Sequence, residues 1–158
     1  MTVLLGSDHA GFGLRRILSN TLIERGHAVA EIGSTGEDAY DYPNAAFELS
    51  RRMQRGDADF GVLMCGTGIG MSIAANKFKG IRAAVCWSVE SAKLAREHNH
   101  ANVLCVGARL IDPDAALAIL DMFLSTPESL ESRHERRVGK IDILGECAEP
   151  AGAKVASL

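Results

Sequence analysis

A single thiol stands where the chain could support proton transfer. Cys65 ends an apolar run and is followed by a glycine-spaced turn in the segment LMCGTGIGMS, residues 63–72. Glycines at 66, 68 and 70 permit a tight turn whose backbone N–H groups point inward at the start of a helix, which favours an anion or oxyanion. A thiol at a helix N-terminus can exchange protons near neutral pH. Two plainer interpretations stay open here: a turn that simply needs glycine, and a thiol that fills space in the core.

Two further segments carry acid–base groups. GSDHAG, residues 6–11, places Asp8 and His9 after an apolar run, which suits sugar hydroxyls, proton movement or a metal, and equally suits a helix cap beside a surface histidine. REHNHAN, residues 96–102, holds His98 and His100. Residues at i and i+2 do not lie on the same helix face, which disfavours binding of one metal ion by both histidines together. The spacing favours a single histidine that acts as an acid or a base.

A basic segment, SRHERRVGK, lies near the end of the chain at residues 132–140. Its basic residues are spaced to share one helix face: Arg133, Arg136, Arg137 and Lys140. Such a face is either simply solvated or captures a phosphate dianion through arginine forks. A net charge of −3 and the absence of aromatic residues in this segment argue against a nucleic-acid partner.

The composition indicates a single globular domain. The chain has 158 residues, of which 47% are hydrophobic and 23% charged. No apolar stretch approaches the ~20 residues of a membrane span, and the first residues lack a signal-peptide pattern, so we expect no membrane partner and a cytoplasmic location. The cysteines are Cys65, Cys86, Cys105 and Cys147. They form no C-x-x-C pair, which favours reduced thiols over zinc or disulfides; we expect Cys86 and Cys105 to be buried, and Cys147 has no assigned role.

Apolar runs alternate with helical patterns along the chain. We predict strands at 2–7, 27–32, 60–65, 81–87 and 102–107. We predict helices at 14–22, 44–54, 71–77, 89–99 capped by Ser88, 113–124 capped by Asp112, and 131–144, with a loose tail over 145–158.

This alternation predicts an α/β fold, an open parallel five-stranded sheet with helices on both faces. Ligands bind such sheets beyond the carboxyl ends of the strands. We therefore expect three segments to converge, namely residues 7–9, 65–70 and 107–109. We also expect the helix end at 98–100 to approach the same edge.

Seven motifs in register resemble one known family. They are GSDHAGF, DYP, CGTGIGMSIAANK, GIRAA, HNxANVL, GAR and RHxxRV. From about residue 2 to 144 the chain resembles the type B ribose-5-phosphate isomerases, whose family includes the galactose-6-phosphate isomerase subunits. The resemblance implies a Rossmann-like domain over 1–144, with the 145–158 tail outside it. It also implies an aldose–ketose isomerase without metal or cofactor, acting as a homodimer or dimer of dimers with active sites at the interface.

The resemblance also implies roles for single residues. Cys65 would be the base that moves a proton between C1 and C2 of the sugar through an enediolate, while Thr67 and His98, with Asp8 nearby, would help to open the furanose ring. Backbone amides would stabilise the enediolate oxygen, at Gly66, Gly68, Ile69 and Gly70. Side chains would hold the substrate: Asn99 and Tyr42 its hydroxyls, and His9, Arg109, Arg133 and Arg137 its phosphate. The last two arginines would reach in from the partner subunit on the C-terminal helix.

The chain departs from the family pattern at two positions, His100 and Ser132, and a third position, Met71, agrees with the members that carry the cysteine. Met71 stands where members that lack the cysteine place a glutamate base, which supports the thiol version. His100 stands where the family usually has aspartate, so the preferred sugar stays open, and Ser132 replaces a usual glycine with little expected effect. Ribose 5-phosphate to ribulose 5-phosphate is the favoured reaction. The alternatives are the same chemistry on a hexose 6-phosphate or tetrose 4-phosphate, and a non-catalytic module that binds phosphosugars or nucleotides.

Overall fold

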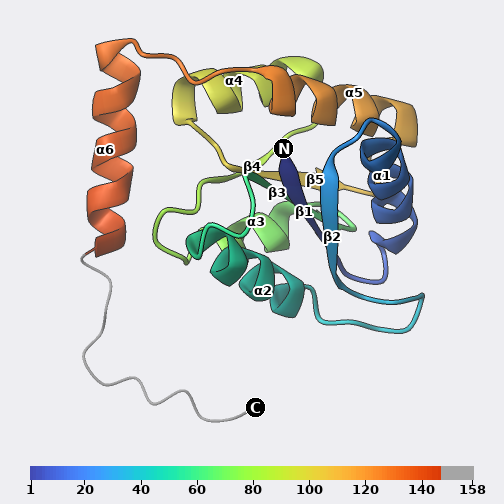
Figure 1. Ribbon diagram of the computed structural model, residues 1–158. Helices are drawn as coiled ribbons and strands as arrows, with labels where there is room; N and C mark the ends of the chain where they lie inside the picture. Colours follow the sequence, from blue (N-terminus) through green and yellow to red (C-terminus); the bar gives the residue numbers. More distant parts are fainter. Residues whose placement is uncertain (147–158) are drawn as a thin grey trace, which may run out of the picture.

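The fold is a parallel sheet between two layers of helices, seen in a computed structural model that describes residues 1–146 (Figure 1). The strands are β1 Thr2–Ser7, β2 Ala28–Gly33, β3 Phe60–Cys65, β4 Ala83–Val85 and β5 Val103–Gly107. They follow the order β2-β1-β3-β5-β4, and all pairs are parallel. The predicted fold class is confirmed. The part of the expected tail from residue 147 onward, with Cys147, lies outside the described residues.

Residues 1–146 form six helices around or beside the sheet. They are α1 Phe12–Glu24, α2 Tyr42–Gln54, α3 Ile69–Ala75, α4 Val89–Asn99, α5 Pro113–Ser125 and α6 Ser132–Glu146. α1, α4 and α5 cover one face and α2 and α3 the other, while α6 stands to one side, beyond β4 (Figure 1). No helix within residues 1–146 is long and apolar enough to cross a membrane.

Both faces of the sheet are buried, so the central strands carry continuous apolar runs. In β1, for example, Val3 and Leu5 pack under α1 and α5, whereas Leu4 packs under α2. The predicted caps are confirmed: the Ser88 side chain accepts a hydrogen bond from Ser91 N at 3.1 Å, and Asp112 accepts one from Ala115 N at 2.9 Å. Each capped helix follows a strand through a short loop: α4 follows β4, and α5 follows β5.

Some element boundaries differ from the sequence prediction. β4 is shorter than 81–87 because Arg82 N donates to the side chain of Asn102, at 2.9 Å, instead of to a strand neighbour. α2 begins at Tyr42 and not at residue 44, because Pro43 fits the first turn of a helix, where its missing N–H costs nothing. α6 continues to Glu146, two residues past its predicted end.

Candidate active site

The topology separates the predicted site residues into two groups. Cys65 at the end of β3 and Arg109 after β5 lie at the carboxyl edge of the sheet, as expected. α4 instead leads from the carboxyl end of β4 back to the amino end of β5, so His98 and Asn99 at its last turn lie at the opposite edge. The prediction that these residues approach the same edge is wrong within one chain. We call the first group, residues 8–9, 42, 65–70 and 109, the cysteine half-site.

The thiol of Cys65 receives a backbone hydrogen bond. Cys65 is only 5% exposed, and Gly68 N donates to its Sγ at 3.2 Å. Gly68 has a φ of 78°, and a Cβ there would lie 3.0 Å from the carbonyl carbon of Val106. Only glycine fits such a conformation and such a close approach. The turn therefore folds back over the sulfur and delivers an N–H to it.

The two residues that follow β5 hold this turn in place through backbone hydrogen bonds. Ala108 N donates to Cys65 O at 2.8 Å, and Arg109 N donates to Gly66 O at 3.1 Å. A Cβ on Gly66 would lie 3.3 Å from Arg109 Nη1, so the guanidinium lies against the turn. The structure thus places a cation beside the loop that follows the thiol, as the phosphate-binding prediction requires.

Tyr42 closes the other side of the turn. It is the first residue of α2, and its ring packs so closely on Gly70 that a Cβ there would lie 2.6 Å from Tyr42 Cζ. Within the turn, Thr67 Oγ1 accepts a weak hydrogen bond from Ile69 N at 3.4 Å. The phenol and the Thr67 hydroxyl therefore flank the start of α3, where a sugar hydroxyl could reach them.

The segment after β1 supplies an acid and an imidazole. Asp8 is buried; its backbone N donates to Met64 O at 3.3 Å, and its Oδ1 accepts from Gly11 N at 2.9 Å. The carboxylate therefore closes the turn before α1, whose N-cap is Gly11, so the helix-cap interpretation of Asp8 is wrong. His9 Nδ1 accepts from Tyr40 N at 3.2 Å. A neutral His9 ring therefore carries its hydrogen on Nε2, the form that can donate to an anion.

Arg15 is a supporting residue that was not predicted from the sequence. Arg15 of α1 is 3% exposed and donates to Ser7 Oγ at 3.0 Å, to Ile32 O at 2.6 Å and to Ser34 O at 2.7 Å. Arg15 thereby connects the carboxyl ends of β1 and β2 through hydrogen bonds, next to the segment that carries Asp8. The sequence does carry a signal, because Arg15 follows Leu14 directly within an apolar helix pattern.

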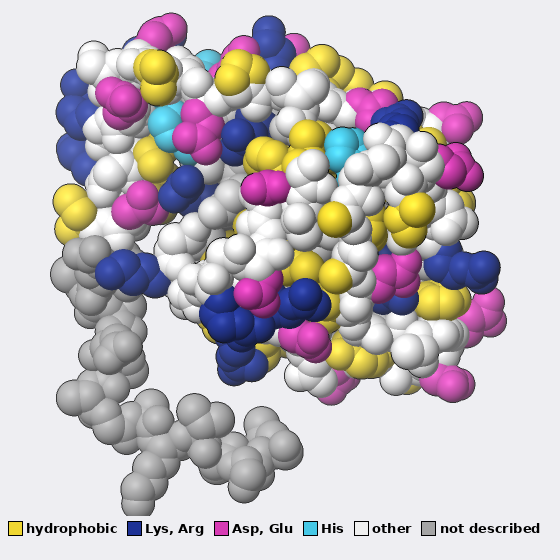
Figure 2. Space-filling model, viewed as in Figure 1, with side chains coloured by type: hydrophobic (Ala, Val, Ile, Leu, Met, Phe, Trp, Pro, Cys, Tyr) yellow, Lys and Arg dark blue, Asp and Glu magenta, His cyan; other side chains and the backbone are white. Residues whose placement is uncertain are grey.

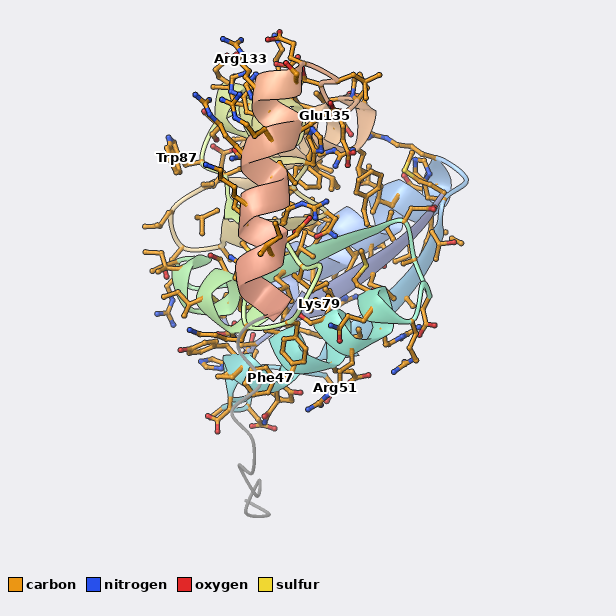
Figure 3. All side chains as sticks on the ribbon, turned by 90° about the vertical axis from the view of Figure 1, so that its left-hand side faces the viewer. Phe47, Arg51, Lys79, Trp87, Arg133 and Glu135 are labelled. Carbon is orange, nitrogen blue, oxygen red and sulfur yellow. The ribbon has the colours of Figure 1, made fainter. Side chains whose placement is uncertain are left out.

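The second group forms around the end of α4 and the start of α6. The rings of His98 and His134 are stacked, with centroids 4.2 Å apart and planes 5° apart. Arg133 is exposed, pairs with Glu131 at 2.8 Å and lies at the upper end of α6 in Figure 3. Arg137 and Asn99 are also exposed. We call this group, residues 98, 99, 133, 134 and 137, the histidine half-site.

Basic side chains gather on the outward side of α6 (Figure 2). His134 and Val138 are buried, whereas Arg133, Arg137 and Lys140 are exposed. The helix therefore uses its apolar side to pack on α4 and leaves its predicted arginine face open to a ligand or to another chain.

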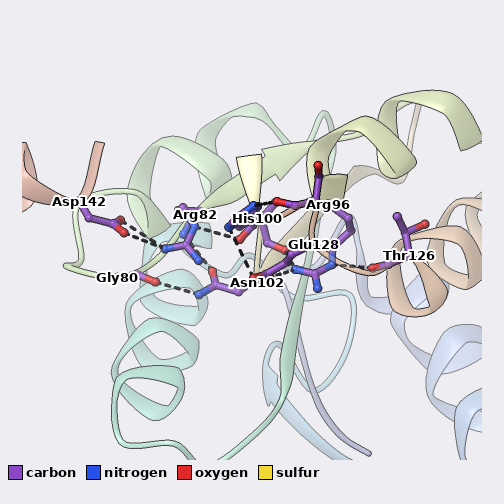
Figure 4. Close-up of polar contacts among 10 residues, drawn as sticks. Gly80, Arg82, Arg96, His100, Asn102, Thr126, Glu128 and Asp142 are labelled. Carbon is purple, nitrogen blue, oxygen red and sulfur yellow. Dashed lines mark hydrogen bonds and ion pairs between the residues drawn. The ribbon is translucent and has the colours of Figure 1, made fainter. Parts of the chain in front are cut away.

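A polar network holds the histidine half-site to the sheet (Figure 4). Arg82 Nε donates to His100 O at 2.9 Å, and Arg82 Nη1 lies 3.3 Å from the Asp142 carboxylate on α6. The His100 ring lies 3.0 Å from Ser129 O and 3.5 Å from the Glu128 carboxylate. The side chain of His100 thus faces the connection between α5 and α6, and not the cysteine half-site of its own chain.

A second arginine anchors the same connection. Arg96 is buried on α4 and donates to Ala101 O at 2.6 Å and to Thr126 O at 3.2 Å. It also pairs with Glu128 at 3.2 Å and stacks over the ring of Phe60. No local sequence signal indicates these roles of Arg82 and Arg96, because most of their partners lie in distant segments of the chain.

The other described cysteines contrast with Cys65. Cys86 and Cys105 are buried, as expected. Burial raises the pKa of the Cys86 thiol to about 11 and also raises the pKa of Cys105 well above its usual value. Both thiols therefore stay protonated at neutral pH. Within residues 1–146, no three histidine, cysteine or acidic side chains are grouped so that they could hold a metal ion.

The sequence matches the family model described as Ribose/Galactose Isomerase over residues 3–141. The chain belongs to this family. It is 44% identical over 147 residues to ribose-5-phosphate isomerase B of Mycolicibacterium paratuberculosis, covering 92% of this chain and 91% of the relative. It is 42% identical over 139 residues to the Escherichia coli protein of that name, covering 88% and 93%.

Solved structures of this isomerase family have the same fold. The ribose 5-phosphate isomerase of Thermotoga maritima matches with a TM-score of 0.88 and 46% identity, covering 90% of this chain and 97% of that one. Ribose-5-phosphate isomerase B of Clostridium thermocellum matches with a TM-score of 0.91 and 42% identity, covering 94% and 100%. The ribose/galactose isomerase fold therefore spans nearly the whole chain.

Proposed function

We propose that the protein is an aldose–ketose isomerase that interconverts D-ribose 5-phosphate and D-ribulose 5-phosphate. The observation that carries the proposal is the Cys65 thiol, which accepts Gly68 N–H at the carboxyl edge of the sheet in a chain of the ribose/galactose isomerase family. Relatives named ribose-5-phosphate isomerase B support the choice of sugar. A cytoplasmic location belongs to the same proposal, because reduced thiols suit that compartment.

The chemistry needs a base and an oxyanion cradle. After ring opening, the Cys65 thiolate takes the proton from C2 of the aldose, and the electron pair forms an enediolate whose charge rests on the carbonyl oxygen. Backbone N–H groups of residues 66–70 stabilise that oxygen; one such donor typically lowers the barrier by about 3 kcal/mol. A proton then moves from the C2 hydroxyl to the C1 oxygen, and return of the carbon-derived proton from Cys65 to C1 gives the ketose, so no cofactor is consumed.

The complete site requires two copies of the chain. His98 and Arg133 lie at the far edge from Cys65, and they cannot serve the thiol of their own chain without unfolding α4. Large apolar side chains on α3 and just after β4 and β5 are exposed: Ile69 54%, Ile73 57%, Trp87 72% and Leu110 70%. Such a surface favours association. We propose a two-fold homodimer in which α6 of each copy brings Arg133 and Arg137 to the cysteine half-site of the other.

Substrate binding then follows from charge and distance. His9 and Arg109 contact the phosphate from one copy, and Arg133 and Arg137 contact it from the other. Tyr42 and Asn99 hold hydroxyls between them. Because the phosphate lies away from C1 and C2, its binding energy orients the reacting carbons.

Solvent deuterium exchange with purified protein tests this function. We expect the wild type to isomerise ribose 5-phosphate in D₂O with deuterium incorporated at carbon, and Cys65→Ser to lose at least about 100-fold in kcat, as expected for a missing general base. Cys86→Ala is the matched control and keeps its activity. Full turnover in Cys65→Ser, or no deuterium in the product, would refute the cysteine base.

A substrate panel tests the choice of sugar. Ribose 5-phosphate is compared with a hexose 6-phosphate and a tetrose 4-phosphate under the same conditions. We expect the highest kcat/KM for ribose 5-phosphate. A higher value for another sugar would keep the chemistry and overturn the assigned substrate.

A further inference from the structure

The histidine half-site contains a buried imidazole that the proposed reaction leaves without a role. His134 is 4% exposed and projects from α6 toward α4. Its ring lies flat on that of His98, with centroids 4.2 Å apart and planes 5° apart. His98 is less buried than His134. The buried ring of His134 therefore sets the orientation of the half-buried ring of His98.

The hydrogen bonds of His134 favour a neutral ring. Arg133 Nε donates to His134 Nε2 at 3.2 Å, so this nitrogen carries no hydrogen. The ring hydrogen then lies on Nδ1, which is buried and has no hydrogen-bond partner among residues 1–146. A second proton would place an N–H of His134 against the N–H of a guanidinium, which would break this contact.

The surrounding charges act mainly in the same direction. The ring is faced by His98 from α4, by Arg133 and Arg137 from α6, and by Glu131 from the preceding connection. Burial, then His98 and Arg133, lower the pKa of His134, while Glu131 opposes the shift. Two stacked imidazoles at this distance cannot both be charged without strong repulsion. The His134 ring is therefore expected to stay neutral.

We propose that His134 is a positioning residue for opening of the furanose ring, with its neutral ring fixing the plane of His98 and leaving His98 to carry the transferred proton. This inference rests on the proposed function. In the step, the anomeric hydroxyl loses a proton, the bond between C1 and the ring oxygen breaks, and the ring oxygen gains a proton to become the C4 hydroxyl. His98 carries one of these protons, and Cys65 takes no part in this step.

Ring opening and enolisation can be measured separately. Ribulose 5-phosphate is open-chain, because its phosphate occupies the oxygen that would close a five-membered ring. Exchange of its C1 hydrogen with D₂O therefore reports enolisation alone, whereas isomerisation of ribose 5-phosphate also needs ring opening. We expect His134→Leu to lower kcat for ribose 5-phosphate by about tenfold or more, the scale of a misplaced catalytic group, and to change the exchange rate by less than about threefold.

Two further variants separate the effect of the stacked ring from the effect of the hydrogen bond to Arg133. His134→Phe keeps a flat ring over His98 and should recover most of the isomerisation, whereas His134→Gln keeps an acceptor for Arg133 but no stacking ring and should behave like the leucine variant. In NMR spectra of the proteins, the ring protons of His98 should shift downfield in the leucine and glutamine variants, because the ring current of His134 is lost. They should shift far less in the phenylalanine variant.

The outcomes are distinct for the two proposals. Equal loss of isomerisation and exchange in folded His134→Leu or His134→Gln, or no loss in either reaction, would overturn the role of His134. Failure of His134→Phe to recover isomerisation would also overturn it. A wild-type protein that performs neither reaction would instead refute the proposed function itself.

Discussion

The two half-sites differ in what holds them in place. In the cysteine half-site, backbone hydrogen bonds and close glycine contacts fix the turn: Arg109 N bonds Gly66 O, and a Cβ on Gly107 would lie 2.8 Å from Thr67 O. In the histidine half-site, side chains hold α6, chiefly Arg82 with Asp142 and the ring of His100 with Ser129 O.

This difference matches the demands of the two tasks. Proton transfer at carbon needs a base and an oxyanion donor placed to within a fraction of an ångström, which hydrogen-bonded backbone provides. Binding a phosphate tolerates more movement, because long arginine side chains adjust to their ligand. We therefore expect changes in the cysteine half-site to lower kcat, and changes in the histidine half-site to raise KM or to affect ring opening.

Gly68→Ala should have the largest effect. It strains a residue with a φ of 78° and pushes a Cβ to 3.0 Å from the carbonyl carbon of Val106, so the N–H that reaches Cys65 must move. We expect kcat to fall by about 100-fold, the loss typical of one oxyanion donor. Gly56→Ala is the matched control, since Gly56 has a φ of 77° with open space around it and shares only the backbone strain. Equal kcat values for the two variants would contradict this role of the turn.

Arg137→Ala should raise KM for ribose 5-phosphate by about tenfold or more and change kcat less, because charge-assisted hydrogen bonds contribute about 1.5–3 kcal/mol. Arg137 is exposed, so the fold should remain stable. Arg136→Ala removes a neighbouring exposed charge of the same helix and should leave steady-state kinetics nearly unchanged. An unchanged KM in Arg137→Ala would remove this arginine from the site.

Stability of the histidine half-site should fall with acid. The pKa of His134 lies below its ordinary 6.5 because of burial, His98 and Arg133, so the unfolded chain binds more protons than the folded one below about pH 6.5. The contact between α4 and α6 should therefore loosen as the pH falls through that range and be fully formed above it. Amide exchange of α6, corrected for intrinsic rates, measures this. His134→Phe should flatten the dependence, and an unchanged slope in that variant would assign it to another group.

His100→Asp should have the smallest effect on catalysis. The side chain of residue 100 faces Glu128 and Ser129, and its φ of 49° suits aspartate at least as well as histidine. We expect KM to change by less than about threefold, in line with a residue outside the binding site, and the order of sugars in the panel to stay the same. A reversed order would show that residue 100 sets sugar preference.

Local sequence signals were sufficient for the fold and for the turn after Cys65, whereas Tyr42 was predicted only through the family resemblance. The apolar runs, the caps at Ser88 and Asp112, and the turn after Cys65 are all encoded within a few residues of one another. The prediction that His98 lies at the carboxyl edge was wrong because α4 runs from the carboxyl end of β4 back to the amino end of β5, which places its last turn at the opposite edge. The stack of His98 on His134 carries no local signal, because α5 separates the two residues along the chain.

Mixing two inactive variants tests the shared site most directly. Cys65→Ser and His98→Asn are purified separately, then mixed in equal amounts under conditions that let subunits exchange. If each site joins the cysteine half-site of one copy to the histidine half-site of the other, every mixed dimer contains one fully wild-type site. We then expect recovery of about one quarter of wild-type activity, because half of the dimers are mixed and each mixed dimer has one intact site of two. No recovery after confirmed exchange would contradict it.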